Sequence, residues 1–226
     1  MVKKLLLKLD QSKSMGPDAM HPKLLATLAS NAHFVDAVTL LFQKCYVTRQ
    51  IPLIWKTANV TALHKKGSKT DPSHYRPISL TSILCKVYET IIRAHVFNHV
   101  SSQISNKQHG FMPNRSCLSN LLESCDIIND MLSSGLAVDI FYLDFMKAFD
   151  TVPHFRLIEK LKSFGISGTV LNVISDFLSN RTFKVVVGNS YSEHFNVTSG
   201  IPQGSVLGPL LFVLYINDLP ENILNC

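Results

Sequence analysis

The feature that most constrains this chain is a change of pattern between residues 137 and 144. Ala137 to Leu143 form a short, almost wholly apolar run with β-branched and aromatic members, which ends at Asp144. Such a run predicts a buried strand. A carboxylate at the exit of a buried strand is costly unless it is paired or binds a metal ion. Asp144 is therefore a candidate metal ligand; it is also compatible with capping the next helical turn, a role for which Asp150 is the stronger candidate.

Apolar residues at helical spacing predict helices on both sides of this strand. The expected helices cover residues 34–45, 83–95, 118–128, 155–164, 170–178 and 205–217. Residues 183–187 and 194–198 flank a Gly188-Asn189 turn and predict a β-hairpin. This mixed order of helices and antiparallel strands predicts an α+β fold rather than a doubly wound sheet.

Composition sets the class of protein. The chain has 226 residues, of which 46% are hydrophobic, enough for one large domain or two small lobes. No apolar run is long enough to span a bilayer and no signal peptide is visible, so we expect an intracellular protein of the cytoplasm and nucleus without a membrane partner. The 5 cysteines form no Cys-x-x-Cys pair, which predicts reduced thiols rather than a disulfide framework or a zinc ribbon.

The net charge of +6 is unevenly distributed. Residues 44–93 contain nine basic and two acidic residues, a net charge of +7, whereas residues 94–226 have a net charge of −3. A basic part followed by a mildly acidic part suits a protein that grips a phosphate backbone with one part and holds metal ions with the other. The same distribution is compatible with an ordinary solvated face.

Two further segments contain candidate binding residues. Ser199 to Ser205 place glycines and a proline in a tight bend ahead of a helix, where backbone N–H groups can face a base or a phosphate and Gln203 can hydrogen-bond a nucleotide. Residues 63–67 and 75–79 are two basic clusters that predict a hairpin able to clamp a triphosphate, with Arg76 as a bidentate fork. Taken singly, each segment is compatible with a plain turn or a solvated loop.

Six short segments together resemble the reverse transcriptases of non-LTR, LINE-type and jockey-like retrotransposons, in the order found in that family. They lie between Lys13 and Pro220 and are residues 64–67, 75–80, 108–111, 143–150, 200–205 and 216–219. The resemblance implies a right-hand polymerase with an antiparallel sheet packed by helices. It implies a helical lead-in over residues 1–45, fingers over 46–137 and a partial palm over 138–226, with the reverse transcriptase domain at about 46–226.

The resemblance also implies roles for individual residues. The implied reaction is RNA-directed addition of deoxynucleotides to a primer 3′-hydroxyl with two Mg²⁺ ions, and the implied partners are an RNA template, a DNA primer and deoxynucleoside triphosphates. The resemblance places the aromatic side chain of Phe149 under the sugar of the incoming nucleotide, where its bulk would exclude a 2′-hydroxyl. The matching residues are Asp144 for the metal ions, Lys65 and Arg76 for the triphosphate, Phe149 for the sugar, Gln203 for the nascent base pair, and Lys66 and Gly204 for the nucleic acid.

Some positions depart from the family pattern. Met15, Ala19, Met112 and Asn114 stand where the family usually has Pro, Gly, Arg and Gly, which suggests a decayed copy. The Ala-Asp-Asp motif expected after Pro220 does not occur before Cys226. Because Asp144 alone cannot fix two metal ions, we expect this fragment to be inactive without a further C-terminal palm and thumb segment.

Two alternatives remain open from the sequence. The chain is compatible with a non-catalytic nucleic-acid-binding relic of a mobile element. It is also compatible with a related polymerase, such as a group II intron reverse transcriptase or an RNA-dependent RNA polymerase. Phe149 argues against RNA synthesis, and the run Lys147 to Asp150 is more similar to LINE elements.

Overall fold

A mixed sheet built from both halves of the chain organises the fold. The computed structural model describes residues 1–219. Its sheet has the order β2-β1-β3-β4, with β5 also paired to β3. The strands are β1 (Thr57–His64), β2 (Tyr75–Leu80), β3 (Arg181–Val187), β4 (Ser190–Tyr191) and β5 (Phe195–Val197). Residues 220–226, the last of the expected palm segment, lie outside the described residues.

The pairing of the strands confirms both expected hairpins and corrects one detail. β1 and β2 are antiparallel, with Leu63 opposite Arg76. β3 turns through Gly188 into β4 and also pairs antiparallel with β5, with Phe183 opposite Phe195. β1 and β3, however, run parallel in register from Thr57↔Thr182, so the sheet is mixed rather than antiparallel. The expected α+β class is confirmed.

The helices predicted from apolar spacing are all present. The helices are α1 (Val2–Leu7), α2 (Pro22–Leu28), α3 (Ala32–Thr48), α4 (Ile83–Val100), α5 (Cys117–Ser133), α6 (His154–Ser163), α7 (Gly168–Leu178) and α8 (Gly208–Ile216), with short 3₁₀ turns η1 (Leu53–Lys56), η2 (Pro72–His74) and η3 (Ser101–Gln103). Side-chain caps fix several starts, because Ser82 Oγ accepts from Cys85 N (3.3 Å) and Ser116 forms a capping box with Ser119.

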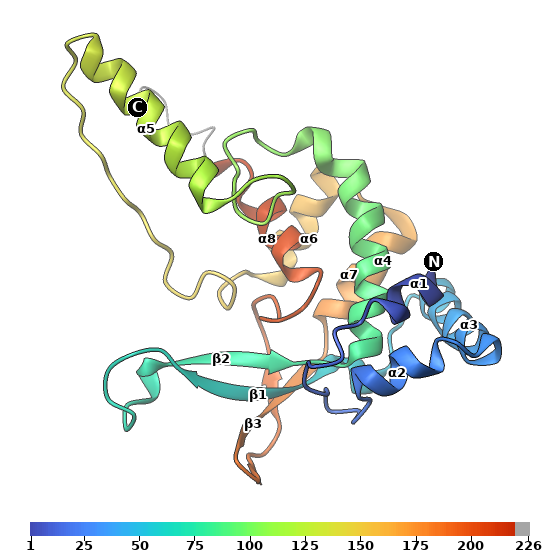
Figure 1. Cartoon of the computed structure of the whole chain (residues 1–226). Helices are drawn as coiled ribbons and strands as arrows, with labels where there is room; N and C mark the ends of the chain where they lie inside the picture. The colour runs from blue at the N-terminus through green and yellow to red at the C-terminus, as the bar shows by residue number, and fades with distance from the viewer. Residues whose placement is uncertain (220–226) are drawn as a thin grey trace.

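The main core lies among the helices rather than along the β1–β2 hairpin, which projects away from them (Figure 1). Leu157, Leu161, Ile174, Leu211 and Leu214 of α6, α7 and α8 are fully buried in it. A partly buried ion pair links Lys56, the residue before β1, to Asp176 of α7. Lys56 Nζ lies 2.7 Å from Asp176 Oδ1, and Asp176 Oδ2 accepts from Ile51 N (2.8 Å). Such a pair is costly to break because one charge would stay buried alone.

The expected buried strand over residues 137–143 is wrong. This segment is extended but forms no strand, and Phe141, Tyr142 and Leu143 are 86%, 90% and 92% exposed. A strand needs a neighbour for its backbone hydrogen bonds, and among residues 1–219 none of the five strands pairs with it. The preceding helix α5 likewise has no buried residue, and Figure 1 shows both lying apart from the sheet.

The described residues also bear on the expectations for thiols and membrane spans. Cys45 and Cys85 are buried, Cys117 and Cys125 are exposed, and all four are free thiols. Within residues 1–219, no single helix combines the length and apolarity needed to cross a bilayer. Only α2 and α3 taken together reach that length and composition, and they are bent by 115°.

Candidate nucleotide site

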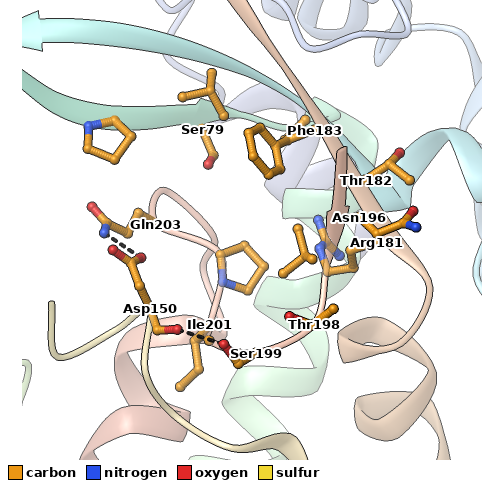
Figure 2. A pocket seen from close by; sticks show the side chains of 16 residues that line it. Ser79, Asp150, Arg181, Thr182, Phe183, Asn196, Thr198, Ser199, Ile201 and Gln203 are labelled. Carbon is orange, nitrogen blue, oxygen red and sulfur yellow. Dashed lines mark hydrogen bonds between the residues drawn. The ribbon is translucent and has the colours of Figure 1, made fainter. Parts of the chain in front are cut away.

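A cavity of about 350 Å³ lies where the sheet meets the loop between β5 and α8. Figure 2 shows the loop residues Ser199, Ile201 and Gln203 on one side and Ser79 and Phe183 on the other. Ala58, Val60 and Pro77 add apolar surface from β1 and β2. An apolar wall facing a few polar groups is the usual composition of a small-molecule site.

Two glycines allow the loop to approach its neighbours closely. Gly200 has φ +87°, and a Cβ there would lie 2.7 Å from the Asp150 Cα. Gly204 has φ +100°, and a Cβ there would lie 2.6 Å from the Ser79 carbonyl oxygen. Both positions combine a left-handed backbone with no room for a side chain, so only glycine fits. The glycines of the bend therefore serve to dock the loop.

Backbone hydrogen bonds hold the loop on two sides. Gly200 N donates to Val152 O (2.9 Å), and Ile201 N donates to Phe149 O (2.8 Å). On the opposite side, Ser79 N of β2 donates to Gln203 O (3.2 Å). The loop thus bridges the turn before α6 and the strand that carries Arg76, so three of the segments that carry the family resemblance meet at one place.

The side chain of Gln203 is oriented by Asp150. Gln203 Nε2 donates to Asp150 Oδ1 over 2.8 Å (Figure 2). The suggestion that Asp150 caps the following helix is wrong, because Pro153 is the N-cap of α6 and no side-chain cap bond forms there. The Asp150 carboxylate instead faces the loop. Gln203 lines the cavity as expected of a nucleotide-contacting residue, although its amide nitrogen is engaged by Asp150.

Glu89 is a buried residue that the sequence analysis missed. Its Oε2 accepts from Val206 N (2.7 Å) and Leu207 N (3.0 Å), which directly follow the loop and precede α8. Burial raises the pKa of Glu89, and the two backbone bonds and the Arg181 charge only partly offset that rise. A signal was present in the sequence, because Glu89 is the one acidic residue in the apolar segment of α4.

Phe149 is packed within an aromatic cluster. Its ring stacks on Phe212 of α8 with centroids 4.6 Å apart, and Phe111 meets it edge-on at 6.0 Å. The side chain is half-buried. Phe111 belongs to the Gln108–Phe111 segment, so a fourth segment of the resemblance joins the same region. Phe149 does not itself line the cavity, but its carbonyl oxygen accepts from the backbone nitrogen of the cavity residue Ile201.

The predicted basic residues lie on the hairpin beyond the cavity. Lys65 and Lys66 follow β1, Arg76 lies on β2, and all three are exposed. Lys65 N donates to His74 O (2.8 Å), which closes the hairpin. None of the three lines the cavity, but Arg76 is next to the cavity residue Pro77. The structure thus brings Gln203 and Gly204 to β2, and leaves the lysines at the hairpin end.

Residues 63–226 match the family described as Reverse transcriptase (RNA-dependent DNA polymerase). The chain belongs to the reverse transcriptase family. The match begins within β1 and includes the hairpin, the Asp144 segment, the cavity loop and α8. The family inferred from the six segments is therefore confirmed.

Two similar proteins are named as RNA-directed DNA polymerases of mobile elements. The reverse transcriptase chain is 33% identical over 98% of its length to the RNA-directed DNA polymerase from mobile element jockey of Drosophila melanogaster. It is 30% identical over 97% of its length to the probable RNA-directed DNA polymerase from transposon X-element of the same organism. In both cases the matched part covers 24% of the relative, so this chain spans about a quarter of their length.

Reverse transcriptases generally use divalent metal ions, and the described residues do not by themselves fit such a site. Asp144 is exposed on the extended segment. Within residues 1–219 no group of three or more His, Cys, Asp or Glu side chains is placed to hold a metal ion. The expected burial of Asp144 is therefore wrong, for the same reason as the missing strand. Its role as a metal ligand stays a prediction.

Proposed function

We propose that this reverse transcriptase chain receives a deoxynucleoside triphosphate opposite an RNA template, as part of a mobile-element RNA-directed DNA polymerase. One observation carries the proposal. The β2 segment, the turn at Phe149 to Val152 and the loop Ser199 to Gly204 are far apart in sequence but are hydrogen-bonded to one another around one cavity. The resemblance to polymerases rests on these segments. Because they meet around one cavity, we infer that they contact the same ligand.

The proposal assigns a contact to each segment. Gln203 and Gly204 face the nascent base pair, and Phe149 lies under the sugar. Arg76 and Lys65 hold the triphosphate, with Lys66 on the nucleic acid. The position of Arg76 on the cavity strand, and the net charge of +7 over residues 44–93, support an anionic ligand on this side. The hairpin lysines would reach the ligand's phosphates or the template backbone beyond the cavity.

The proposal limits the isolated chain to binding. In the complete enzyme two Mg²⁺ ions would act with Asp144, but the described residues supply no cluster to hold them. We therefore propose that synthesis requires metal-binding carboxylates in addition to those of residues 1–219, supplied by a palm and thumb segment. The fingers would comprise residues 46–137 after the lead-in 1–45, with the palm from 138. The RNA and DNA partners are compatible with an intracellular location in cytoplasm and nucleus.

The test is nucleotide-dependent binding. The chain is titrated against an RNA template annealed to a dideoxy-terminated DNA primer, with each of the four deoxynucleotides in turn. The proposal predicts that the nucleotide complementary to the next template base tightens the complex more than the other three. Equal effects of all four nucleotides would contradict it.

A second candidate is a nucleic-acid-binding relic without a nucleotide site. The concentration of positive charge in residues 44–93, and the lack of an acidic cluster in residues 1–219, favour this candidate. It predicts that primer–template binds the chain in a salt-dependent manner but that no nucleotide changes the affinity. The titration above therefore separates the two candidates directly.

A further inference from the structure

We propose that Asp150 is a positioning residue that fixes the amide of Gln203, so that Gln203 presents its carbonyl oxygen Oε1 as an acceptor to the bound nucleotide. The inference rests on the proposed function, because it concerns how Gln203 meets the ligand. It assigns a role to Asp150, the last residue of the Lys147 to Asp150 segment. The carboxylate would act through Gln203 and would not touch the reacting atoms.

The chemistry of the two side chains sets the orientation. An ionised carboxylate can only accept hydrogen bonds, whereas an amide has a donor nitrogen and an acceptor oxygen that otherwise can exchange places by rotation. Because Asp150 Oδ1 lies 2.8 Å from the Gln203 side chain, the nitrogen must face Asp150. The Gln203 oxygen is left on the other side of the amide, available to a donor group of the ligand.

The Gln203 backbone is fixed independently of this bond. Its carbonyl oxygen accepts from Ser79 N (3.2 Å), so the residue is held to β2 through the main chain and to Asp150 through the side chain. With both ends held, few rotamers of Gln203 remain. A side chain ordered before binding loses less conformational entropy when the ligand arrives.

The Asp150 backbone is itself docked against the loop. Ser199 Oγ donates to Asp150 O (3.1 Å), and Gly200 has no room for a Cβ because the Asp150 Cα is adjacent. His154 Nε2 also donates to Gly200 O (2.7 Å). The turn and the loop therefore form one unit whose relative position does not depend on the Asp150 carboxylate. Removing that carboxylate should release the amide and leave the loop in place.

A double-mutant cycle tests the inference in the full 226-residue chain. The dissociation constant of the complementary deoxynucleotide is measured on the dideoxy-terminated primer–template complex for wild type, D150A, Q203A and D150A/Q203A. We expect D150A to weaken nucleotide binding by roughly three- to tenfold, the range for the net contribution of one ordinary solvent-accessible hydrogen bond. We expect D150A/Q203A to be no weaker than Q203A, because Asp150 acts only through Gln203.

Controls separate positioning from other effects. D139A removes an exposed acid from the neighbouring extended segment and should leave nucleotide binding unchanged, which excludes a general effect of net charge. The D150N/Q203E variant restores a donor–acceptor pair with reversed polarity and should recover part of the loss caused by Q203E. The ¹⁵N resonance of the Gln203 side-chain amide should shift in D150A without nucleotide, which reports the bond itself.

The outcomes distinguish this inference from the proposed function. Losses in D150A and Q203A that simply multiply in the double variant would overturn the positioning role, as would a D150A chain that binds like wild type. A wild-type chain on which no nucleotide binds would overturn the proposed function and the inference with it. An unshifted Gln203 amide resonance in D150A would overturn the geometric basis of the inference, whatever the binding result.

Discussion

The Oε2 atom of Glu89 lies 2.7 Å from the backbone nitrogen of Val206, which joins the middle of α4 to the residue that leads from the cavity loop into α8. The same oxygen accepts from Leu207 N. The Glu89 side chain and its bond to Leu207 are buried, and the bond to Val206 is partly buried. Burial, the largest effect, raises the pKa of Glu89, whereas the charge of Arg181 and a hydrogen bond with Cys85 both lower it. Glu89 therefore anchors the loop from the interior while β2 holds it from the cavity side.

This contact predicts a specific dependence of stability on pH. The folded-state pKa of Glu89 is raised above its ordinary value of 4.5. Between pH 4.5 and the raised pKa, the folded chain therefore binds more protons than the unfolded chain. Its contribution to stability is then full below pH 4.5 and is lost as the pH rises through the raised pKa. E89Q keeps an oxygen for the two N–H groups and should lack this loss, as urea unfolding from pH 4 to 8 would show.

E89A provides the matching control at constant pH. Removing the acceptor leaves two buried N–H groups unpaired, which should cost about 2–4 kcal/mol of unfolding free energy at pH 7. If E89Q and E89A were equally unstable and showed the same pH profile as wild type, the carboxylate would not act as the anchor of the loop.

A second prediction concerns the Phe149–Phe212 stack. F149A removes a half-buried ring that packs on α8 and on Phe111, and should lower the unfolding free energy by about 2 kcal/mol. F155A on α6 is the matched control, because Phe155 is 76% exposed and its loss should cost no more than about 0.5 kcal/mol. Equal costs in urea unfolding would mean that the stack does not stabilise the fold.

The proposed place of Phe149 under the sugar predicts a change in selectivity. F149V shortens the side chain while keeping an apolar surface against Phe212, and should improve binding of the complementary ribonucleotide relative to the deoxynucleotide by about tenfold. The measurement is the ratio of the two dissociation constants on the same primer–template complex. An unchanged ratio in a folded F149V chain would remove Phe149 from the sugar contact.

How far the fold could be predicted depends on the range of the interactions. Helices such as α4 and α5 were predictable because apolar spacing and the caps at Ser82 and Ser116 are local features of the sequence. The parallel pairing of β1 with β3 joins Thr57 to Thr182, and no local pattern encodes such a partner. The segment 137–143 has the composition of a strand but no pairing partner among residues 1–219, so composition alone misled the assignment.

In the candidate site, too, residues defined by a local pattern were predictable and residues that act through long-range contacts were not. Gln203, Gly200 and Gly204 were recognisable from the bend they encode, and Gln203 and Gly200 line the cavity. Asp150 and Glu89 were not recognisable as site residues, because each hydrogen-bonds the loop or the residue after it from a distant part of the chain. A lone acidic residue in an apolar helix is the one sequence signal that pointed to Glu89.

A fourth prediction concerns the exposed cations of the hairpin. Replacing Lys65, Lys66 and Arg76 with Ala should weaken binding of primer–template and lower the slope of log K against log salt by about two to three, because fewer counterions are released. The control replaces Lys3, Lys4 and Lys8, exposed in or next to α1, and should leave the slope unchanged. Equal slopes for the two triple variants would show that the hairpin charges form only a solvated face.

Hydrogen–deuterium exchange tests most directly whether the cavity between β2 and the loop is the nucleotide site. Exchange is compared for the chain with dideoxy-terminated primer–template alone and after addition of the complementary deoxynucleotide, with a non-complementary nucleotide as control. We predict added protection in residues 75–80 and 199–206 with the complementary nucleotide and little change in α1 and α2. Protection confined to other segments, or identical exchange with both nucleotides, would contradict the account.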